Sequence, residues 1–228
     1  MYSLLLLNGG VGARVGAGQP KQLLKVRGIP ILVYSLVAVD EIEEVTQIIL
    51  NYPPGWREQV EQVLQAYAIK TTVTFVEAGD SRHSSVAAML PHAENDKVII
   101  HEAARPLATK DDFENLIAAP QENVSLMLSI PFTVAPVDPN THEVTGSLER
   151  DRLRNVQLPQ KFNKAHLQEA HEYAVANDKV FTEDATLVAV AGKPVHFIEG
   201  ASQNFKVTTP VDVRLATYLL QEDEGEDE

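Results

Sequence analysis

Near its N-terminus the chain reads YSLLLLNGGVGAR, which covers residues 2–14. The unbroken apolar run over residues 2–7 predicts a short strand that is buried on both faces. The glycines that follow predict a loop, because glycine adopts positive φ and lets other groups approach the backbone closely. In such a loop successive backbone N–H groups can surround an anion. The stretch therefore predicts a strand that leads directly into a phosphate-binding loop.

Strand-like and helix-like segments alternate through most of the remaining chain. Apolar runs predict further strands over residues 45–50, 71–76, 98–101, 124–130 and 195–198. Helical spacing of apolar residues predicts helices over residues 31–39, 56–67, 84–90, 110–118, 164–176, 182–191 and 211–220. This order is typical of an α/β fold with a Rossmann-like, doubly wound and mostly parallel sheet. Ligands of such sheets bind beyond the carboxyl ends of the strands.

The alternation stops after Pro131. Proline and glycine recur up to Arg152, and Asp138-Pro139-Asn140 is a strong turn signal. We expect a β-arm at about residues 132–152 that projects from a single domain formed by residues 1–220. Residues 222–228 hold six carboxylates among seven residues, so we expect residues 221–228 to be a disordered acidic tail.

Composition excludes several classes of protein. The 228 residues carry 32 acidic and 19 basic side chains, and without the six tail acids the remaining charge is 19 − 26 = −7. That balance argues against general nucleic-acid binding but not against binding of one small anion. The chain has no cysteine, which excludes thiolate metal sites and cysteine nucleophiles. No apolar run approaches the length of a membrane span, and we expect a cytoplasmic protein.

The glycine loop differs from the two best-known nucleotide loops. Its spacing, Gly10-x-Gly12-x-x-x-Gly16, is one residue too long for the dinucleotide fingerprint, and no Gly-Lys-Ser/Thr follows. Arg14 lies inside the loop, and Lys21 follows shortly after it. Two cations beside a glycine loop suit a triphosphate, because they can neutralise charge on a leaving pyrophosphate. A plain tight turn and a dehydrogenase remain as alternatives.

The residues Gly9-Gly10-Val11-Gly12-Ala13-Arg14, followed by Pro20-Lys21-Gln22, resemble the signature of CTP-dependent sugar-phosphate nucleotidyltransferases. The chain is most similar to the 2-C-methyl-D-erythritol 4-phosphate (MEP) cytidylyltransferases and then to the ribitol-5-phosphate cytidylyltransferases. The resemblance implies the nucleotide-diphospho-sugar transferase type of fold. It also implies that the loop holds CTP phosphates while two cations stabilise the leaving group. The loop residues concerned are Asn8, Gly9, Gly10 and Gly12, and the cations are Arg14 and Lys21.

A second motif, Gly79-Asp80-Ser81-Arg82, follows the third predicted strand. From the residues alone, Asp80 lies in a turn and Ser84 or Ser85 caps the next helix. The resemblance implies that Gly79, Asp80 and Ser85 bind the cytosine base. It leaves Arg82 as either a structural residue or a neighbour of the phosphates.

The third motif is His101-Glu102-Ala103-Ala104-Arg105-Pro106, at the end of the fourth predicted strand. An acid at this place is a natural Mg²⁺ ligand, although a surface acid paired with Arg105 is the plainer alternative. The resemblance implies that Glu102 binds Mg²⁺ and that Ala103 and Arg105 contribute to the nucleotide site. The family pattern has Asp where this chain has Glu102, which is one methylene longer.

Two more segments supply cations. Lys206, in Asn204-Phe205-Lys206-Val207, lies in an apolar stretch, where a lysine is costly unless it meets an anion or extends to solvent. The resemblance implies that Lys206 contacts the phosphates. It also implies that Arg150, near the end of the arm, binds the acceptor phosphate from the partner subunit of a homodimer.

Other positions depart from the family pattern. The segment Thr182-Glu183-Asp184 has its two acids exchanged, and we expect Thr182 to cap a helix. Ala135 and Leu158 stand where MEP-specific relatives carry threonine. Losing two hydroxyls removes potential hydrogen bonds to the acceptor.

We therefore expect a cytidylyltransferase that joins CTP to a sugar or polyol phosphate and releases pyrophosphate. MEP, a precursor in isoprenoid synthesis, is the first choice of acceptor. Ribitol 5-phosphate, another polyol phosphate or a phosphonate are alternatives. A different class stays open, namely a catalytically weak nucleotide-binding relative that acts as a sensor or scaffold. A large rise in activity on Glu102→Asp substitution would indicate an impaired metal site.

Overall fold

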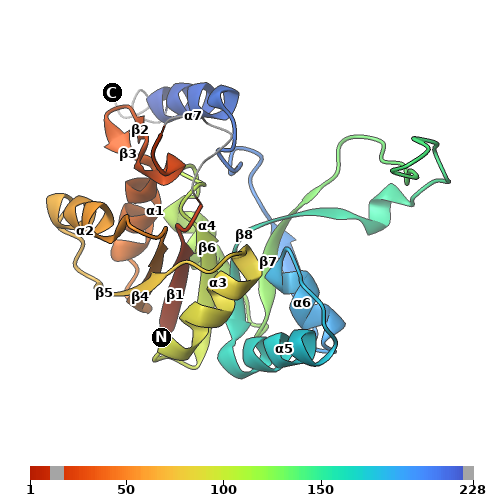
Figure 1. Ribbon diagram of the computed structural model, residues 1–228, viewed down its shortest axis with the longest axis horizontal. Helices are drawn as coiled ribbons and strands as arrows, with labels where there is room; N and C mark the ends of the chain where they lie inside the picture. The colour runs from red at the N-terminus through yellow and green to blue at the C-terminus, as the bar shows by residue number, and fades with distance from the viewer. Residues whose placement is uncertain (11–17, 223–228) are drawn as a thin grey trace.

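A seven-stranded sheet forms the centre of the computed structural model, which describes residues 1–10 and 18–222. Its strands are β1 (Tyr2–Leu7), β4 (Val45–Tyr52), β5 (Thr72–Glu77), β6 (Lys97–Glu102), β7 (Val124–Ser129), β8 (Arg154–Asn163) and β9 (His196–Glu199). They lie in the order β5-β4-β1-β6-β8-β7-β9 (Figure 1). Strand β8 runs antiparallel to β6 and β7, and the other pairings in the sheet are parallel. The prediction of a mostly parallel α/β sheet is confirmed.

Helices cover both faces of this sheet (Figure 1). One face packs against α1 (Ile31–Asp40), α2 (Arg57–Ala66) and α4 (Lys110–Ala118). The other face packs against α3 (Arg82–Met89), α5 (Lys164–Ala176) and α6 (Asp184–Val190). Helix α7 (Pro210–Glu222) packs on the short ribbon of β2 (Lys25–Val26) and β3 (Ile29–Pro30). Single 3₁₀ turns occur at Lys21–Leu23, Leu90–His92 and Arg150–Arg152.

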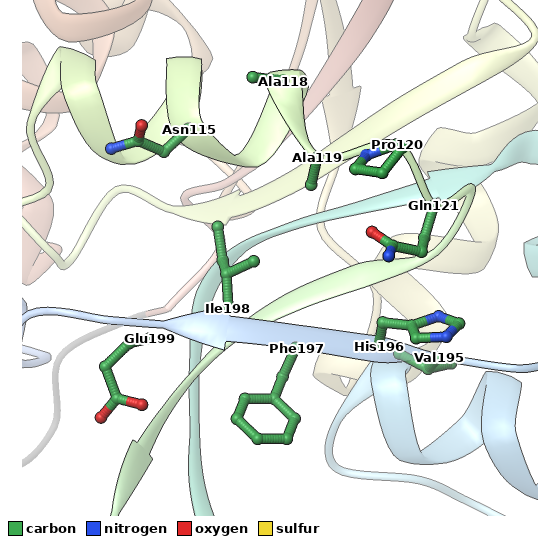
Figure 2. Close-up of a pocket in the computed structure, with 10 residues that line it drawn as sticks. All are labelled: Asn115, Ala118, Ala119, Pro120, Gln121, Val195, His196, Phe197, Ile198 and Glu199. Atoms are coloured by element: carbon green, nitrogen blue, oxygen red, sulfur yellow. The ribbon is translucent and has the colours of Figure 1, made fainter.

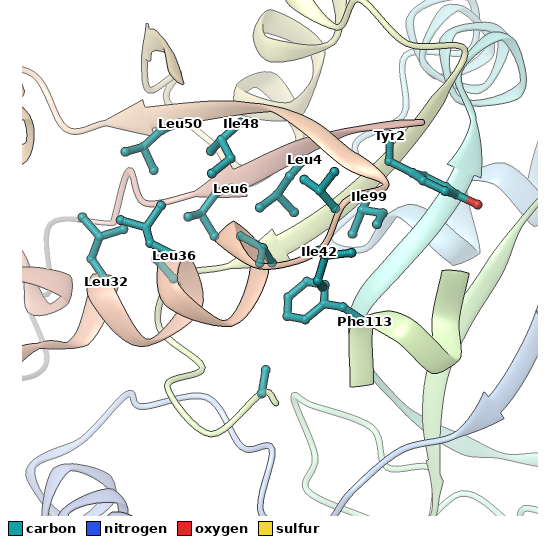
Figure 3. Close-up of a cluster of buried hydrophobic side chains, with 14 of the residues drawn as sticks. Tyr2, Leu4, Leu6, Leu32, Leu36, Ile42, Ile48, Leu50, Ile99 and Phe113 are labelled. Atoms are coloured by element: carbon teal, nitrogen blue, oxygen red, sulfur yellow. The ribbon is translucent and has the colours of Figure 1, made fainter. Parts of the chain in front are cut away.

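The leucines of β1 alternate between the two cores. Leu4 and Leu6 point to the side of α1, where they meet Leu32 and Leu36 (Figure 3), and Leu5 belongs to the core on the opposite face. All three of these leucines are fully buried. A strand that is buried on both faces needs apolar residues at every position. The four consecutive leucines therefore mark an interior strand of the sheet.

Strand β8 is an element that the sequence pattern did not predict. It lies between β6 and β7, although its ten residues, RNVQLPQKFN, include Pro159 and several polar side chains. Proline argues against a central strand, because it cannot donate a hydrogen bond to the ladder. The buried side chain of Gln160 donates from Nε2 to the Ser125 hydroxyl at 3.0 Å. This bond links β8 to β7 inside the sheet.

Two helices begin at a different residue from the one predicted. Ser81, rather than Ser84 or Ser85, is the N-cap of α3, and its hydroxyl accepts the Ser84 N–H at 3.0 Å. Glu183, rather than Thr182, caps α6, and its carboxylate accepts the N–H groups of Ala185 and Thr186. In both helices the cap is a residue whose side chain reaches the free N–H groups of the first turn.

Residues between β7 and β8 extend away from the sheet as an arm (Figure 1). A bridge between Val137 and Val144 pairs its two sides in antiparallel fashion. The predicted turn lies at its tip, where the Asp138 carboxylate accepts the N–H groups of Asn140 and Thr141. Exposed apolar side chains of the arm are Phe132, Val137, Val144 and Leu148. Across residues 1–10 and 18–222, the structure contains no helix long and apolar enough to span a membrane.

Candidate active site

The strand order places a binding crevice beside β1. The chain passes outward from β1 to β4 and β5, and then returns to the other side of β1 with β6. This reversal is the topological switch point at which open α/β sheets bind ligands, beyond the carboxyl ends of the strands. A pocket of about 420 Å³ lies there. Predicted site residues that line it are Gly9, Gly10, Lys21, Gly79, Asp80, Ser85, Glu102 and Lys206.

A second hollow, of about 800 Å³, lies at the far edge of the sheet (Figure 2). It is lined by the end of α4 and by β9, including the exposed side chain of Phe197. None of the predicted site residues lines it. The pocket at the switch point is therefore the candidate active site, because the glycine turns and the cations converge there.

The end of β1 is fixed by the neighbouring strand β4. The backbone N–H of Asn8 donates to Oδ1 of Asn51, at the end of β4, with a distance of 2.5 Å. A Cβ at Gly9 would lie 2.4 Å from the Cβ of Ala78 and 3.0 Å from Nδ2 of Asn51. Glycine is therefore required here so that the three strand ends can approach one another. The predicted contributors Gly12 and Arg14 lie outside the described residues.

Replacing Gly9 by alanine should weaken nucleotide binding more than it unfolds the protein. The new methyl group would push apart the ends of β1 and β5, an overpacking cost of about 1–3 kcal/mol. We expect the Kd for CTP, measured by titration calorimetry, to rise by about tenfold or more. A matched control is Gly28→Ala, in the turn between β2 and β3, which should leave the Kd unchanged. An unchanged Kd for Gly9→Ala would contradict this role of Gly9.

A second turn, after β5, forms another wall of the pocket. The Gly79 N–H donates to the Ser85 hydroxyl at 3.1 Å, which ties the turn to the first residues of α3. A Cβ on Gly79 would lie 2.5 Å from Oγ of Ser84, within the capping interactions of this helix. Asp80 is exposed beside these residues, and Ser85 is buried. The turn is thus held in one conformation by its own side chains.

Three cations surround Glu102 at the end of β6. Oε2 of Glu102 lies 2.9 Å from Nζ of Lys206 and 3.6 Å from Nε of Arg105. Oε1 lies 3.3 Å from Nε of Arg82. Burial alone would raise the pKa of this carboxyl, but Lys206, Arg82 and Arg105 outweigh burial and lower the pKa to about 2. Glu102 is therefore ionised at neutral pH, and the cluster keeps an excess of positive charge.

Backbone contacts hold the Lys206 segment against the pocket. Lys21 donates from Nζ to the Val207 carbonyl at 2.7 Å, and the Val207 N–H donates to the Ala104 carbonyl at 2.8 Å. Arg105 donates from Nη1 to the Asn204 carbonyl at 2.8 Å. The segments carrying Lys21, Glu102 and Lys206, which are far apart in the sequence, therefore meet in one wall. Ala103 is buried behind them, and its N–H donates to the Leu7 carbonyl at 3.0 Å.

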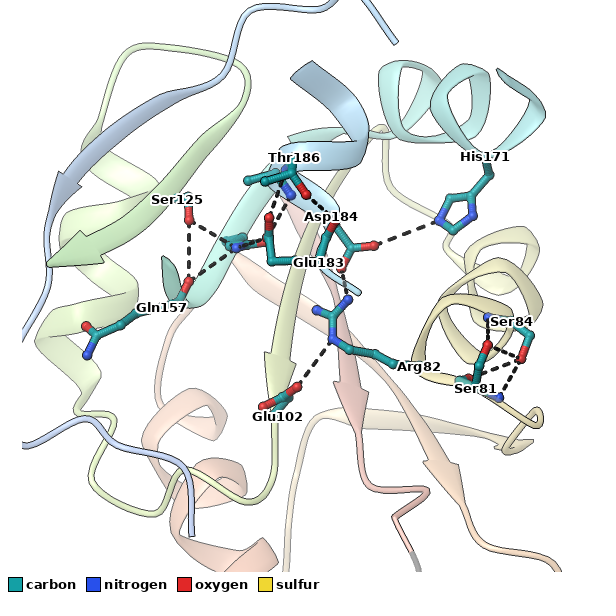
Figure 4. Close-up of polar contacts among 12 residues, drawn as sticks. Ser81, Arg82, Ser84, Glu102, Ser125, Gln157, His171, Glu183, Asp184 and Thr186 are labelled. Carbon is teal, nitrogen blue, oxygen red and sulfur yellow. Dashed lines mark hydrogen bonds and ion pairs between the residues drawn. The ribbon is translucent and has the colours of Figure 1, made fainter. Parts of the chain in front are cut away.

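Sequence reasoning missed two features of this site. Asn51 lines the pocket and orients the glycine loop, yet β4 carries no motif around it. Arg82 connects Glu102 to Asp184 of α6, at 3.3 Å and 2.6 Å (Figure 4). The position of Arg82 in the second motif was a signal for its importance, but nothing in the sequence pointed to its partners.

The acids of the pocket suit a metal that arrives with a ligand rather than a metal held by protein alone. Within residues 1–10 and 18–222, no group of three or more His, Cys, Asp or Glu side chains could hold an ion. Two acids line the pocket, Asp80 and Glu102. Mg²⁺ commonly takes one or two carboxylates together with phosphate oxygens and waters. The donor set therefore fits Mg²⁺ bound mainly by a triphosphate.

Arg150 lies apart from this cluster. It belongs to the 3₁₀ turn Arg150–Arg152, which precedes β8 in the chain, and lines a separate hollow with Thr133 and Leu148. It is exposed, and it does not line the pocket at the switch point. Among the described residues, one copy of the chain does not bring Arg150 together with Lys21, Glu102 and Lys206.

These features define a class of protein. A glycine turn at the switch point, a second turn held by Ser85 and a group of lysine and arginine side chains form a site for a nucleotide with several phosphates. The fold and site are those of a nucleotidyltransferase.

Comparisons with known proteins identify the family. The family model of 2-C-methyl-D-erythritol 4-phosphate cytidylyltransferase matches residues 3–222. The enzyme of that name from Bacillus cytotoxicus is 34% identical over 221 residues, covering 96% of this chain and 98% of the relative. The enzyme of that name from Synechococcus sp. is 36% identical over 228 residues, covering 96% of this chain and 97% of the relative. The chain therefore belongs to the MEP cytidylyltransferase family.

Solved structures agree with this assignment. The crystal structure of the MEP cytidylyltransferase from Thermus thermophilus has a TM-score of 0.76 and 28% identity, covering 97% of this chain and 100% of that one. The crystal structure of 4-diphosphocytidyl-2C-methyl-D-erythritol synthase from Anaerococcus prevotii has a TM-score of 0.85 over 97% of this chain and 96% of that one. At 23% identity, the second likeness supports the fold alone. Family and fold together make this chain a CTP-dependent nucleotidyltransferase.

Proposed function

We propose that this protein transfers a cytidylyl group from CTP to the phosphate of 2-C-methyl-D-erythritol 4-phosphate and releases pyrophosphate. The observation that carries the proposal is the convergence of Arg82, Arg105 and Lys206 around Glu102 at the switch point of the sheet, in a pocket that Lys21 also lines. Such an excess of cations matches the charge of a triphosphate meeting a phosphate. The names and full-length similarity of the relatives support the choice of CTP and MEP.

In the proposed reaction, a phosphate oxygen of MEP attacks the α-phosphorus of CTP. The bond from that phosphorus to the bridging oxygen of the pyrophosphate breaks, and the electron pair leaves with pyrophosphate. The enzyme contributes positioning and charge neutralisation, and it forms no covalent intermediate. Residues Asn8, Gly9, Gly10, Gly12, Ala103 and Arg105 would hold the triphosphate, while Gly79, Asp80 and Ser85 would hold the base.

Lys21, Lys206 and Arg14 would stabilise the charge that develops during transfer. Before CTP binds, Glu102 reduces the repulsion between Lys206 and Arg105, since its carboxylate lies 2.9 Å from one and 3.6 Å from the other. The triphosphate then offers these cations more negative charge than one carboxylate does. We assign Glu102 as the protein ligand of a Mg²⁺ that accompanies CTP. When bound, this ion would neutralise charge on the phosphates.

Arg150 would bind the MEP phosphate from the partner subunit of a homodimer. Its place on a projecting arm, away from the pocket of its own chain, supports a contribution to another copy. The exposed apolar side chains of the arm would be covered in the same assembly. Each active site would then contain Lys21 of one subunit and the arm of the other.

Mixing two inactive variants tests this arrangement. Lys21→Ala and Arg150→Ala should each have little activity alone. If the site is shared, unfolding and refolding them together restores one intact site in each mixed dimer, which is about a quarter of wild-type activity. The control is each variant refolded alone at the same total concentration. Recovery no greater than the sum of the two variants would contradict a shared site.

An acceptor panel tests the substrate assignment. Pyrophosphate release should be fastest with CTP and MEP, and ribitol 5-phosphate, other polyol phosphates and the three other nucleoside triphosphates should be poor substrates. Ala135 and Leu158 remove two hydroxyls expected near the acceptor, which makes ribitol 5-phosphate the necessary competitor. A higher kcat/KM for ribitol 5-phosphate than for MEP would replace the proposed acceptor while retaining the cytidylyltransferase.

A further inference from the structure

Arg82 lies between two buried carboxylates that belong to different parts of the fold. Its Nε lies 3.3 Å from Oε1 of Glu102, at the end of β6. Its Nη1 lies 2.6 Å from Oδ2 of Asp184, in the first turn of α6. The two acidic side chains are 8% and 2% exposed, respectively. Figure 4 shows the guanidinium between them, so one side chain connects the nucleotide pocket with a helix that does not line it.

Asp184 does not line the pocket, and the burial of its carboxyl group is costly. Burial raises the pKa of Asp184, and Arg82 provides the main opposing charge. A further contact of Asp184 is with His171, whose Nε2 lies 3.9 Å from Oδ1. Burial lowers the pKa of His171 to about 4, so this ring is neutral at neutral pH. A buried carboxylate is retained when it is paired, and Arg82 is the partner that opposes the effect of burial on Asp184.

Arg82 also lines the nucleotide pocket, where a triphosphate would attract it. A guanidinium is a rigid, planar fork that can bind two acceptors in fixed directions. In this structure Nη1 of the Arg82 guanidinium contacts Asp184, and the Nε atom contacts Glu102. The pair with Asp184 therefore restrains Arg82 from turning toward phosphate and keeps it against Glu102.

We propose that Asp184 is a positioning residue: by anchoring Arg82 it fixes the Glu102 carboxylate at the wall of the nucleotide pocket. The proposal deepens the cytidylyltransferase assignment and rests on it. Because Arg82 contacts both carboxylates, shortening one acidic side chain should be compensated by lengthening the other. Removing one methylene from Glu102 withdraws its carboxylate by about 1.5 Å, the length of a carbon–carbon bond. Adding one to Asp184 pushes the guanidinium toward the space that opens.

A double-mutant cycle with Glu102→Asp and Asp184→Glu tests this coupling. We expect each single substitution to lower kcat by about tenfold, with little change in the KM for MEP. The double variant should recover to within about threefold of wild type, because the total length across Arg82 is restored. The Kd for CTP, measured with and without Mg²⁺, should follow the same pattern. Asp111→Glu, at the exposed start of α4, is the matched control.

Additive losses, with the double variant worse than either single variant, would overturn the proposal. Asp184→Asn provides a second test that does not need a longer side chain. It keeps the shape of Asp184 and removes its charge, so kcat should fall by about tenfold or more while the near-UV spectrum stays native. Wild-type kcat in that variant would also overturn the proposal. If the wild-type protein turns over no acceptor, the proposed function fails. The same double-mutant cycle, measured by the Kd for CTP, then still decides whether Glu102 and Asp184 are coupled.

Discussion

Replacing Lys206 by methionine should lower kcat by about 10²- to 10³-fold, the usual effect of removing one preorganised charge at a reacting phosphate or oxyanion. Methionine keeps most of the length of the side chain and removes the ammonium group that lies 2.9 Å from Glu102. The loss should appear in kcat with both substrates saturating, measured by continuous pyrophosphate release. The KM for MEP should change little, because its phosphate is assigned mainly to Arg150.

The same substitution has a second consequence at Glu102. Lys206 is the strongest of the three charges that lower the pKa of this carboxyl. Without it the pKa should rise, and the acid limb of the pH–rate profile should move to higher pH. Lys25→Met, at the exposed position of β2, is the control for loss of a lysine. A kcat within about threefold of wild type for Lys206→Met would contradict the role of Lys206 in transfer.

Acidification from pH 7.5 to pH 5 should destabilise the folded protein by several kcal/mol. Burial lowers the pKa of His101 to about 3 and that of His171 to about 4, and cationic arginines add to both shifts. Both rings are neutral in the folded protein, whereas in the unfolded chain they take up protons below about pH 6.5. The stability that they contribute is fully present above pH 6.5 and is lost as the pH falls toward 4. Each histidine contributes about 2 kcal/mol at pH 5.

Other groups can be separated from this effect. The depressed pKa of Glu102 affects the stability only at lower pH, where its contribution is lost between about pH 4.5 and pH 2. Burial raises the pKa of Asp184, so protonation of this carboxyl favours the folded state as the pH falls and offsets part of the lost stability. Urea unfolding of wild type and His171→Gln at both pH values measures the contribution of His171. The variant should lose about half of the pH dependence, and His142→Gln, on the exposed arm, is the control for the substitution itself. Equal stability of the wild type at both pH values would show that these histidines are not neutral in the fold.

The fold was predictable wherever one local pattern determined an element. The leucines of β1 and the helical spacing over residues 110–118 and 164–176 correspond to the observed elements, because burial on both faces or on one stripe leaves a periodic signal. Strand β8 left no such signal. Its apolar and polar residues do not alternate cleanly, and Pro159 argues against a strand. Its place in the sheet depends on pairing with β6 and β7, which are distant in sequence.

The site was predictable to the same extent. Glycine turns and cations at strand ends indicated where phosphate would bind, because the carboxyl ends of parallel strands share one edge. The partners of Arg82 were not predictable. Two positions noted as departures from the family pattern, Glu102 and the exchanged pair that ends in Asp184, meet at this one side chain. Residues 82, 102 and 184 come together only through the packing of α3 and α6 on the sheet.

The most direct test of the account is to follow the reaction of CTP and MEP by ³¹P NMR. Direct transfer predicts that pyrophosphate and a new diphosphate diester appear in equal amounts, and that no pyrophosphate is released until MEP is added. Release of pyrophosphate from CTP without an acceptor, or with CMP in place of the diester, would contradict a cytidylyl transfer to the acceptor phosphate.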